Sequence, residues 1–474
     1  MFRKILIANR GEIAVRIIGT CRRLGIRTVA VFSGADQDSL HVRMADEAYM
    51  IGAPPAARSY LDQDAVIRAA REAKAEAIHP GYGFLSENPV FAALVGAHGM
   101  KFIGPSADAI RCLGDKVNAR TIAIKNGVPV IPGTKGVVRS AGEARAKARR
   151  IGYPILIKAS AGGGGKGMRV VRADGDLAGA VDAAMGEAKA AFGSSEVFFE
   201  RFIEGARHVE IQILADEHGN CVHFGERECS VQRRHQKIIE ETPSVVVTPE
   251  MRSRMGEAAK RLVLAAGYAN AGTVEFIVDG NNDFYFLEVN TRLQVEHPIT
   301  EMCNGVDLVA LQLEASAGER LAIDQESVAP EGAAIECRIC AEDPSRDYAP
   351  SSGRVEKLTF PNNPGLRIDT FLYEGCEVPI FYDSLLAKMI SHGKNRAEAI
   401  QRMKHALDHT KIEGVETNRK LCRYVLGREE FVSGAYDTSL LQSIPFNEEL
   451  YGAYATRTAD KVGTHIFDGT YHTD

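Results

Sequence analysis

The sequence predicts a protein of mixed α/β and α+β class, built from three regions and a short tail. Over the first hundred residues, short β-branched runs alternate with helical patterns, which is typical of a doubly wound parallel sheet. From Leu113 to about Gly318, strand patterns occur in pairs joined by glycine-containing turns, which indicates antiparallel pairing. From about Gly332 to near Leu450, strand and helix patterns return and predict a third region.

The elements of the first region follow in a regular order. KILIAN is followed by the helix-like GEIAVRIIGTCRRLG, by TVAVFS, by the helix-like LDQDAVIRAAREAKAE, and by AIHP and KFIGP. Ligands of such sheets bind at the carboxyl ends of the strands, so the glycine-rich HPGYGFLSEN at residues 79–88 is a candidate site loop. The alternative is a plain turn from strand to helix.

Composition excludes several classes of function. The chain has 474 residues, 45% hydrophobic and 25% charged, with a formal net charge of -5, so we expect no nucleic acid partner. No apolar run approaches the roughly 18 residues of a membrane span, so we expect no membrane partner. Nine cysteines without a signal peptide indicate reduced thiols in a cytoplasmic protein. The final residues, YATRTADKVGTHIFDGTYHTD, are polar with little periodicity and predict a tail.

A glycine-rich hairpin is predicted at residues 155–171, ILIKASAGGGGKGMRVV. Gly162, Gly164 and Gly167 have GxGxxG spacing, but the residues that follow, Met168–Val171, resemble a second strand rather than a helix. A glycine flap between two antiparallel strands, with Lys158 on the first, is typical of a lid that closes over nucleotide phosphates. The alternative is a flexible hairpin without a ligand.

A second hairpin, TVEFIVDGNNDFYFLEVN, predicts a metal site. Symmetric closure of its turn on Asn281 and Asn282 places Glu275 opposite Glu288. Like charges directly opposite each other require a cation or a raised pKa. With the amide of Asn290, these oxygens suit Mg²⁺ or Mn²⁺ shared with substrate phosphates. A solvated hairpin face is the alternative, and a bulge would break the register.

The polar row of this hairpin continues along residues 286–300, FLEVNTRLQVEHPIT. If the stretch is extended, Glu288, Asn290, Arg292, Gln294 and Glu296 share one face. The last three, a cation, an amide and an acid, could hold a small planar anion while the acid takes a proton. The segment ERECSVQRRHQKIIEE at 226–241 is either a solvated basic patch, which its residues alone slightly favour, or a strand end near this site.

Several long motifs resemble those of biotin carboxylase, a family of the ATP-grasp superfamily. They are KILIANRGEIAVRI, HPGYGFLSEN, GGGGKGM, CSVQRRHQK, EVNTRLQVEHPITE, ECRICAED and FYDSLLAKMI, in family order from Phe2 to about Leu441. The resemblance implies a doubly wound pre-ATP-grasp domain at 1–114, an ATP-grasp domain at 115–330 with a mobile lid at about 132–203, a C-terminal biotin carboxylase domain at 331–446, and a tail at 447–474.

The resemblance also implies a reaction and its site residues. ATP phosphorylates bicarbonate to carboxyphosphate, which releases CO₂ beside biotin, and N1′ of biotin is carboxylated. Metal ligands are implied at Glu275 and Glu288, with Asn290 nearby. ATP-binding residues are implied at Lys116, Lys158, Gly162, Gly163, Gly164, Gly165, Lys166, Gly167, Met168, Glu200, Ile203, His208, Gln232 and His235. Bicarbonate and biotin residues are implied at Lys237, Arg292, Gln294, Val295, Glu296 as general base, Arg338, Tyr82 and Asp383.

Two departures from the family pattern bear on these expectations. DYAPSSGRV stands where the family often has Phe-x-Pro-Ser, which concerns the packing around Tyr348. The Ala-Met-Lys-Met biotinylation signature is also missing, and Lys388 in FYDSLLAKMI is not expected to carry biotin. The chain is therefore expected to depend on a separate biotin carboxyl carrier protein and a separate carboxyltransferase. The resemblance also implies a homodimer, which is common in the family. Another ATP-grasp ligase or a catalytically silent nucleotide-binding subunit are the competing hypotheses.

Overall fold

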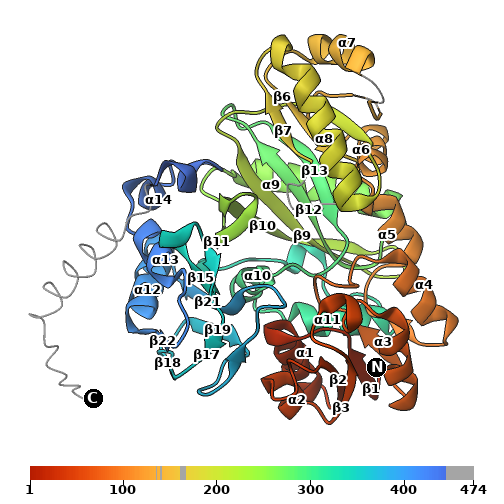
Figure 1. The fold of residues 1–474 in the computed structure, drawn as a ribbon, viewed down its shortest axis with the longest axis vertical. Helices are drawn as coiled ribbons and strands as arrows, with labels where there is room; N and C mark the ends of the chain where they lie inside the picture. Colours follow the sequence, from red (N-terminus) through yellow and green to blue (C-terminus); the bar gives the residue numbers. More distant parts are fainter. Residues whose placement is uncertain (135, 139–140, 161–166, 445–474) are drawn as a thin grey trace, which may run out of the picture.

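The computed structural model describes residues 1–134, 136–138, 141–160 and 167–444, the side chains of 141 and 142 excepted. The predicted tail at 447–474 and most of the glycine loop lie outside the described residues. In Figure 1 the N-terminal part, red, lies at the bottom, the C-terminal part, blue, lies at the left beside the central sheet, and a small helix-covered sheet forms the top. This arrangement confirms the mixed α/β and α+β class.

The N-terminal sheet is parallel and doubly wound, as predicted. Its strand order is β3-β2-β1-β4-β5, and every pair of neighbours is parallel. The strands are β1 Lys4–Ile7, β2 Arg27–Ser33, β3 Glu47–Gly52, β4 Ala77–His79 and β5 Lys101–Phe102, connected by α1 Gly11–Arg23, α2 Leu40–Met44, α3 Gln63–Glu72 and α4 Pro89–Ala97. The carboxyl ends of β1 and β4 lead directly into the segments around Gly11 and Tyr82 that line the main cavity.

A central sheet of eight strands joins the second and third regions. Its order is β13-β12-β9-β10-β11-β14-β21-β19. The strands are β9 Arg207–Ala215, β10 Cys221–Arg233, β11 Gln236–Thr242, β12 Asn270–Val278, β13 Phe284–Asn290, β14 Ala333–Cys340, β19 Leu366–Thr370 and β21 Leu385–Gly393. Because β11 pairs with β14, the sheet continues across the predicted domain boundary at 330/331.

Helices cover this central sheet and enclose its apolar core. One buried cluster includes Val274 and Phe276 of the sheet together with Met255 and Leu262 of a packed helix, and a second cluster surrounds Met389. The helices are α5 Ala107–Gly114, α6 Lys116–Lys125, α9 Pro249–Ala265, α10 His297–Asn304, α11 Leu308–Ser316, α12 Arg396–His409, α13 Arg419–Val425 and α14 Glu429–Ser433. Their burial fixes the strands that carry the polar residues of the site.

The segment predicted as a lid forms its own small sheet. The strand order is β7-β6-β8, with β6 Ile155–Ala159, β7 Arg169–Val171 and β8 Val197–Arg201, covered by α7 Ala141–Ile151 and α8 Leu177–Phe192. The expected antiparallel hairpin is present, since Ile157 pairs with Arg169. Of the glycine motif, only Gly167 and Met168 belong to the described residues, and Gly167 has a left-handed φ of 71°.

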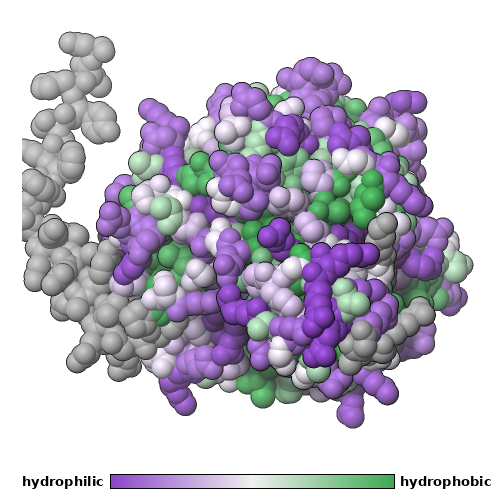
Figure 2. Space-filling view, turned by 90° about the horizontal axis from the view of Figure 1, so that it is seen from above, coloured by the Kyte–Doolittle hydropathy of each residue, from purple (hydrophilic) through white to green (hydrophobic). Residues whose placement is uncertain are grey.

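The surface in Figure 2 is mostly hydrophilic, with small and separate hydrophobic areas. Within the described part of the chain, no helix is long and apolar enough to cross a membrane.

Candidate active site

One cavity of about 1000 Å³ lies where the N-terminal sheet, the lid segment and the central sheet meet. It gathers most of the predicted site residues that the structure describes. They are Tyr82, Lys116, Lys158, Met168, Ile203, His208, Gln232, His235, Lys237, Glu275, Glu288, Asn290, Arg292, Gln294, Val295, Arg338 and Asp383. Gly167, Glu200 and Glu296 are not among the lining residues, and residues 162–166 lie outside the described chain.

Glu275 and Glu288 are directly opposite each other across β12 and β13, as the sequence predicts. The turn differs from the prediction, because Phe276 pairs with Phe286 and the ladder closes around Asn281. A bulge between the Glu275 and Phe276 pairs then adds one residue to β13 and restores the predicted glutamate pair. The bulge therefore preserves the pair instead of breaking it, and Leu287 and Glu288 both line the cavity.

The acidic row is longer than the sequence indicates. Glu210 in β9 is directly opposite Glu275, and Arg227 in β10 is directly opposite Glu210. Three carboxylates therefore stand side by side across β9, β12 and β13. The buried Arg227 guanidinium lies 2.5 Å from Glu210 and stabilises one end of this row. A period-two pattern of polar residues, His208, Glu210 and Gln212 in RHVEIQILA, is the signal that could have predicted it.

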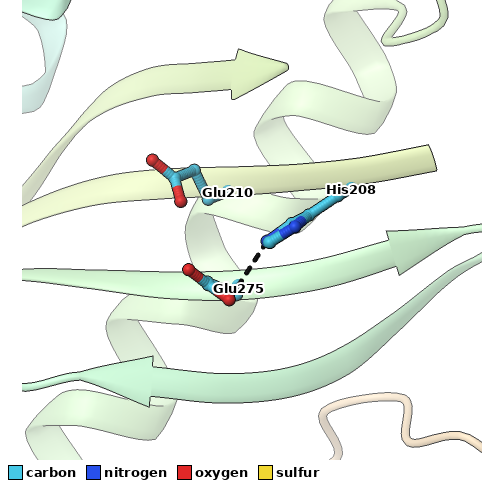
Figure 3. A group of neighbouring side chains, drawn as sticks. All are labelled: His208, Glu210 and Glu275. Carbon is cyan, nitrogen blue, oxygen red and sulfur yellow. Dashed lines mark ion pairs between the residues drawn. The ribbon is translucent and has the colours of Figure 1, made fainter. Parts of the chain in front are cut away.

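A lysine lies at the centre of the acidic row. Lys237 Nζ lies 2.6 Å from Glu210, 3.0 Å from Glu275 and 2.6 Å from Glu296. Burial alone would lower the pKa of Lys237, but these carboxylates hold it well above its ordinary value. Figure 3 shows His208, Glu210 and Glu275, which are close enough to hold a metal ion, with the His208–Glu275 ion pair of 3.0 Å. The Lys237 ammonium already serves as the cation of this group.

The donor set at the outer end of the row fits a divalent cation. Glu288 pairs with Lys116 at 2.9 Å, while Oε1 of Glu275 accepts hydrogen bonds from Asn290 and Gln294. Burial alone would raise the pKa of Glu275, but Lys237 and His208 hold it well below its usual range. Both acids lie beside the Asn290 amide, and such an all-oxygen set suits Mg²⁺ or Mn²⁺.

The polar row beyond Asn290 is not an extended strand. β13 ends at Asn290, and residues 291–296 form a loop before α10. The loop still brings the predicted residues to the cavity, because Arg292 donates to Gln294 at 2.9 Å and to Glu87 at 2.8 Å. Glu87 also accepts from the backbone of Thr291, so it anchors the loop at two points. Glu87 lies in HPGYGFLSEN, so this motif lines the cavity, as expected of a candidate site loop.

Glu296 and Arg338 form the inner part of the site. Arg338 Nη2 lies 2.9 Å from Glu296, whose side chain is fully buried, and Arg338 Nε lies 2.6 Å from Glu240. Burial alone would raise the pKa of Glu296, but Lys237 and Arg338 hold it well below its usual range. Glu296 is therefore ionised at neutral pH.

The hairpin of β10 and β11 carries the basic segment into the cavity. Its turn residues Arg234 and His235 both have left-handed φ angles, 48° and 67°. Gln232 is directly opposite Lys237, and all four side chains line the cavity. The segment is therefore a strand end that reaches the cavity, with Arg234 and His235 on its exposed turn.

The lid segment contributes a lysine and an apolar wall. Lys158 lines the cavity and lies 2.5 Å from Glu200, which also pairs with Arg120 at 2.9 Å. Glu200 is thus buried behind Lys158 and positions it instead of lining the cavity. Apolar lining comes from Leu156, Met168, Val170 and Ile203.

Tyr82 and Asp383 lie on the remaining rim of the cavity. Tyr82 donates a hydrogen bond to the buried Glu12, which also lies 3.1 Å from Lys388. Lys388 is fully buried and donates to the backbone carbonyl of Val295 at 3.0 Å. Lys388 therefore holds the Val295 loop in place.

Three family models match successive parts of the chain. Residues 1–110 match the biotin carboxylase N-terminal domain, 115–324 the ATP binding domain of the carbamoyl-phosphate synthase L chain, and 336–443 the biotin carboxylase C-terminal domain. Together with the lid segment and the charged cavity, these matches define an ATP-grasp enzyme.

Relatives and solved structures cover nearly the whole chain. Biotin carboxylase 1 of Bacillus subtilis is 50% identical over 94% of this chain and 99% of its own length. Biotin carboxylase of Haemophilus influenzae is 50% identical over 93% of this chain and 98% of its own length. The biotin carboxylase domain dimer of Hydrogenobacter thermophilus 2-oxoglutarate carboxylase, in complex with MgADP, ADP and bicarbonate, has a TM-score of 0.92 at 44% identity, covering 95% of this chain and 99% of that one. The chain belongs to the biotin carboxylase family.

Proposed function

We propose that this chain carboxylates biotin on a separate carrier protein, using ATP and bicarbonate, as the first half-reaction of an acyl-CoA or 2-oxoacid carboxylase. A bicarbonate oxygen attacks the γ-phosphorus, and the bond to ADP breaks. The resulting carboxyphosphate releases CO₂ and phosphate. N1′ of biotin loses its proton to that phosphate and bonds to the CO₂ carbon. The observation that carries the proposal is the Lys237–Glu296–Arg338 chain of ion pairs beside the acidic row.

The nucleotide would occupy the side of the cavity that carries the acidic row and the lid segment. Glu275 and Glu288, with Asn290 nearby, would hold Mg²⁺ or Mn²⁺, which would neutralise phosphate charge. Lys116 and Lys158 would bind phosphate oxygens. Each lysine lies within 2.9 Å of a glutamate in this structure, which holds its ammonium group at the cavity. The remaining proposed nucleotide residues are residues 162–168, Glu200 behind Lys158, Ile203, His208, Gln232 and His235.

Bicarbonate would bind in the loop that follows β13. Arg292, Gln294 and Lys237 would hold its oxygens together with the backbone of Val295. Glu296 would take the bicarbonate proton. One oxygen of its buried carboxylate accepts a hydrogen bond from Lys237 and the other accepts one from Arg338. These two cations would keep the carboxylate ionised and oriented until bicarbonate binds.

Biotin would lie beside Arg338. Negative charge develops on the ureido oxygen when N1′ is deprotonated, and a fixed guanidinium stabilises such charge most in the transition state. Nε and Nη2 of Arg338 are fixed by Glu240 and Glu296, while Nη1 makes no hydrogen bond to any described residue. Tyr82 and Asp383 would line the biotin side.

The domain division 1–114, 115–330, 331–446 and a tail at 447–474 remains part of this proposal, supported by family matches to three successive segments. A biotin carboxyl carrier protein and a separate carboxyltransferase would be the partners. A homodimer is proposed because a similar domain is described as a dimer. Cytoplasmic location is proposed because all nine cysteines are free thiols. This includes Cys337 and Cys340 of β14, which have CxxC spacing in the sequence but form no disulfide.

Transfer of isotope-labelled bicarbonate to free biotin by the purified chain, with Mg²⁺ and ATP, tests the product of this reaction. Labelled carboxybiotin that forms only when ATP is present would support the proposal. Absence of carboxybiotin, with ATP hydrolysed to activate another carboxylate, would instead favour a different ATP-grasp ligase.

A further inference from the structure

Two buried glutamates face each other on the strands that carry Arg338 and Lys237. Glu240 in β11 is directly opposite Glu336 in β14, and both residues have no exposed surface. Two carboxylates at adjacent cross-strand positions repel each other, and a low-dielectric interior disfavours ionisation of both. In the proposed reaction Glu240 holds Arg338, but Glu336 has no role.

Most of the carboxylate oxygens of this pair lack a hydrogen-bond donor. Oε1 of Glu240 accepts from Arg338 Nε at 2.6 Å, but Oε2 of Glu240 and both oxygens of Glu336 are buried without a hydrogen-bond partner. Among the described residues, no cation lies within 4 Å of Glu336. A buried carboxylate without hydrogen bonds or a counter-ion is strongly disfavoured, whereas a protonated Glu336 is neutral and needs no counter-ion.

Charged and titratable side chains from several neighbouring elements surround the pair. β14 contributes Arg338 and β21 contributes Lys388, whose ammonium is already bound to Glu12 and Asp369.

Lys237 of β11 and Glu296 before α10 also interact electrostatically with the pair. So do Tyr82, Cys229 of β10 and Cys337 of β14, and α10, which begins with His297 and contains Cys303, packs against β14. Burial raises the pKa of Glu240 to about 7 and that of Glu336 well above its ordinary value, which agrees with the geometry.

We propose that Glu240 and Glu336 hold one proton between them at neutral pH, carried by Glu336, and that the neutral Glu336 is a positioning residue for Arg338. This inference rests on the proposed function for its catalytic consequence, but not for the proton itself. With Glu336 neutral, Arg338 is opposed by Glu240 and by Glu296, which it shares with Lys237. An ionised Glu336 would add a further negative charge beside the guanidinium and weaken its hold on the biotin anion.

The pair therefore makes biotin carboxylation sensitive to alkaline pH. Because the pKa of the pair is raised, the proton is present below that pKa and is lost as the pH rises through it. Carboxylation of biotin should fall over that range in the wild type. Glu336→Gln keeps the shape of the side chain and is neutral at every pH, so it should lack this decline.

Infrared spectroscopy of the whole chain tests the proton without reference to activity. The wild type near neutral pH should show the C=O stretching band of a buried protonated carboxylic acid, shifted in D₂O. The band should be weaker in Glu336→Gln by the contribution of that one carboxylic acid. Glu241→Gln is the matched control, because Glu241 is the next residue of β11, is equally buried, and pairs with Arg396 at 2.6 Å away from Arg338. The control should keep the band.

Kinetics test the positioning role. Glu336→Gln should keep the wild-type rate of biotin carboxylation near neutral pH to within about threefold and exceed the wild type in alkaline solution, with a smaller difference in bicarbonate-dependent ATP hydrolysis. A loss of about tenfold at neutral pH, or an unchanged alkaline decline, would overturn the positioning role. A wild-type spectrum without the band would overturn the shared proton, even if Glu336→Gln fails to fold. If the wild type carboxylates no biotin, the proposed function and the positioning role both fail, and the spectrum alone still decides the proton.

Discussion

Lys237 Nζ lies 2.6 Å from Glu296 Oε1, although the lysine belongs to the β10–β11 hairpin and the glutamate precedes α10. This contact connects the acidic row of the central sheet with Arg338 on β14. It places a proton acceptor, its counter-ions and the proposed nucleotide site within one cavity. Each part of that arrangement can be tested separately.

Removing Glu296 should abolish the activation of bicarbonate. Glu296→Gln keeps the side-chain shape but cannot accept a proton, so bicarbonate-dependent ATP hydrolysis should fall by roughly 10²–10⁴-fold. Glu301→Gln is the matched control, since Glu301 is also a buried glutamate, paired with Arg16 at 2.8 Å, and it does not line the main cavity. Equal losses in the two variants would show that the effect is structural.

Replacing Glu288 should remove a metal ligand. In Glu288→Gln, ATP hydrolysis should fall by roughly a hundredfold or more at fixed Mg²⁺. Glu288→Lys should lose at least as much, because it removes the metal ligand and places a second cation beside Lys116. Asp283→Asn, on the exposed turn of the same hairpin, should leave the Mg²⁺ dependence unchanged. Wild-type hydrolysis by Glu288→Lys would refute the metal assignment.

Arg338→Gln should separate the two stages of the proposed reaction. Carboxylation of biotin should fall by about a hundredfold, because the developing anion loses its guanidinium, while bicarbonate-dependent ATP hydrolysis should fall much less. Arg367→Gln removes another arginine that binds a buried glutamate, Glu301 at 2.6 Å, and should affect both activities equally. Equal loss of both activities in Arg338→Gln would contradict its proposed role.

The lid segment should close over bound nucleotide. Limited proteolysis should cut within residues 160–170 of the free chain, and Mg-ATP should protect that segment because phosphates supply new contacts to its backbone and to Lys158. The fragments can be identified by mass spectrometry. Cutting at equal rates with and without Mg-ATP would refute lid closure.

Stability should fall in mild acid because buried histidines stay neutral in the fold. Burial lowers the pKa of His41 to about 4 and that of His79 to about 3. Below pH of about 6.5 the unfolded chain binds protons that the folded chain excludes, so the free energy of unfolding declines as the pH falls toward 4, by roughly 3 kcal/mol for His41. Urea unfolding should show a smaller decline for His41→Gln than for the wild type or for the exposed control His98→Gln. Parallel declines would contradict the assignment.

The sequence predicts those parts of the fold that depend on local pattern. The N-terminal strands and helices follow from periodicity, and the Glu275–Glu288 pair follows from hairpin symmetry, although a bulge compensates for a turn centred one half-residue away. The sequence pattern could not show that the strand ends at Asn290, because polar and apolar residues keep alternating through the loop up to Glu296.

Contacts between distant segments account for what the sequence did not predict. Glu210 lies 65 positions before Glu275 in the sequence, and only the pairing of β9 with β12 brings them together. Glu87 meets Arg292 across two domains, and Glu240 meets Glu336 across the continuous sheet. In each of these three pairs, the role of one charged residue depends on a partner that is distant in the sequence, and no local motif specifies that partner.

The most direct test of the proposed half-reaction is ATP hydrolysis by the purified chain with Mg²⁺, measured with bicarbonate present or removed and with free biotin present or absent. We expect hydrolysis to require bicarbonate and to rise with biotin. Hydrolysis that is indifferent to both, or no hydrolysis at all, would contradict the proposed half-reaction and favour another ATP-grasp ligase or a silent nucleotide-binding subunit.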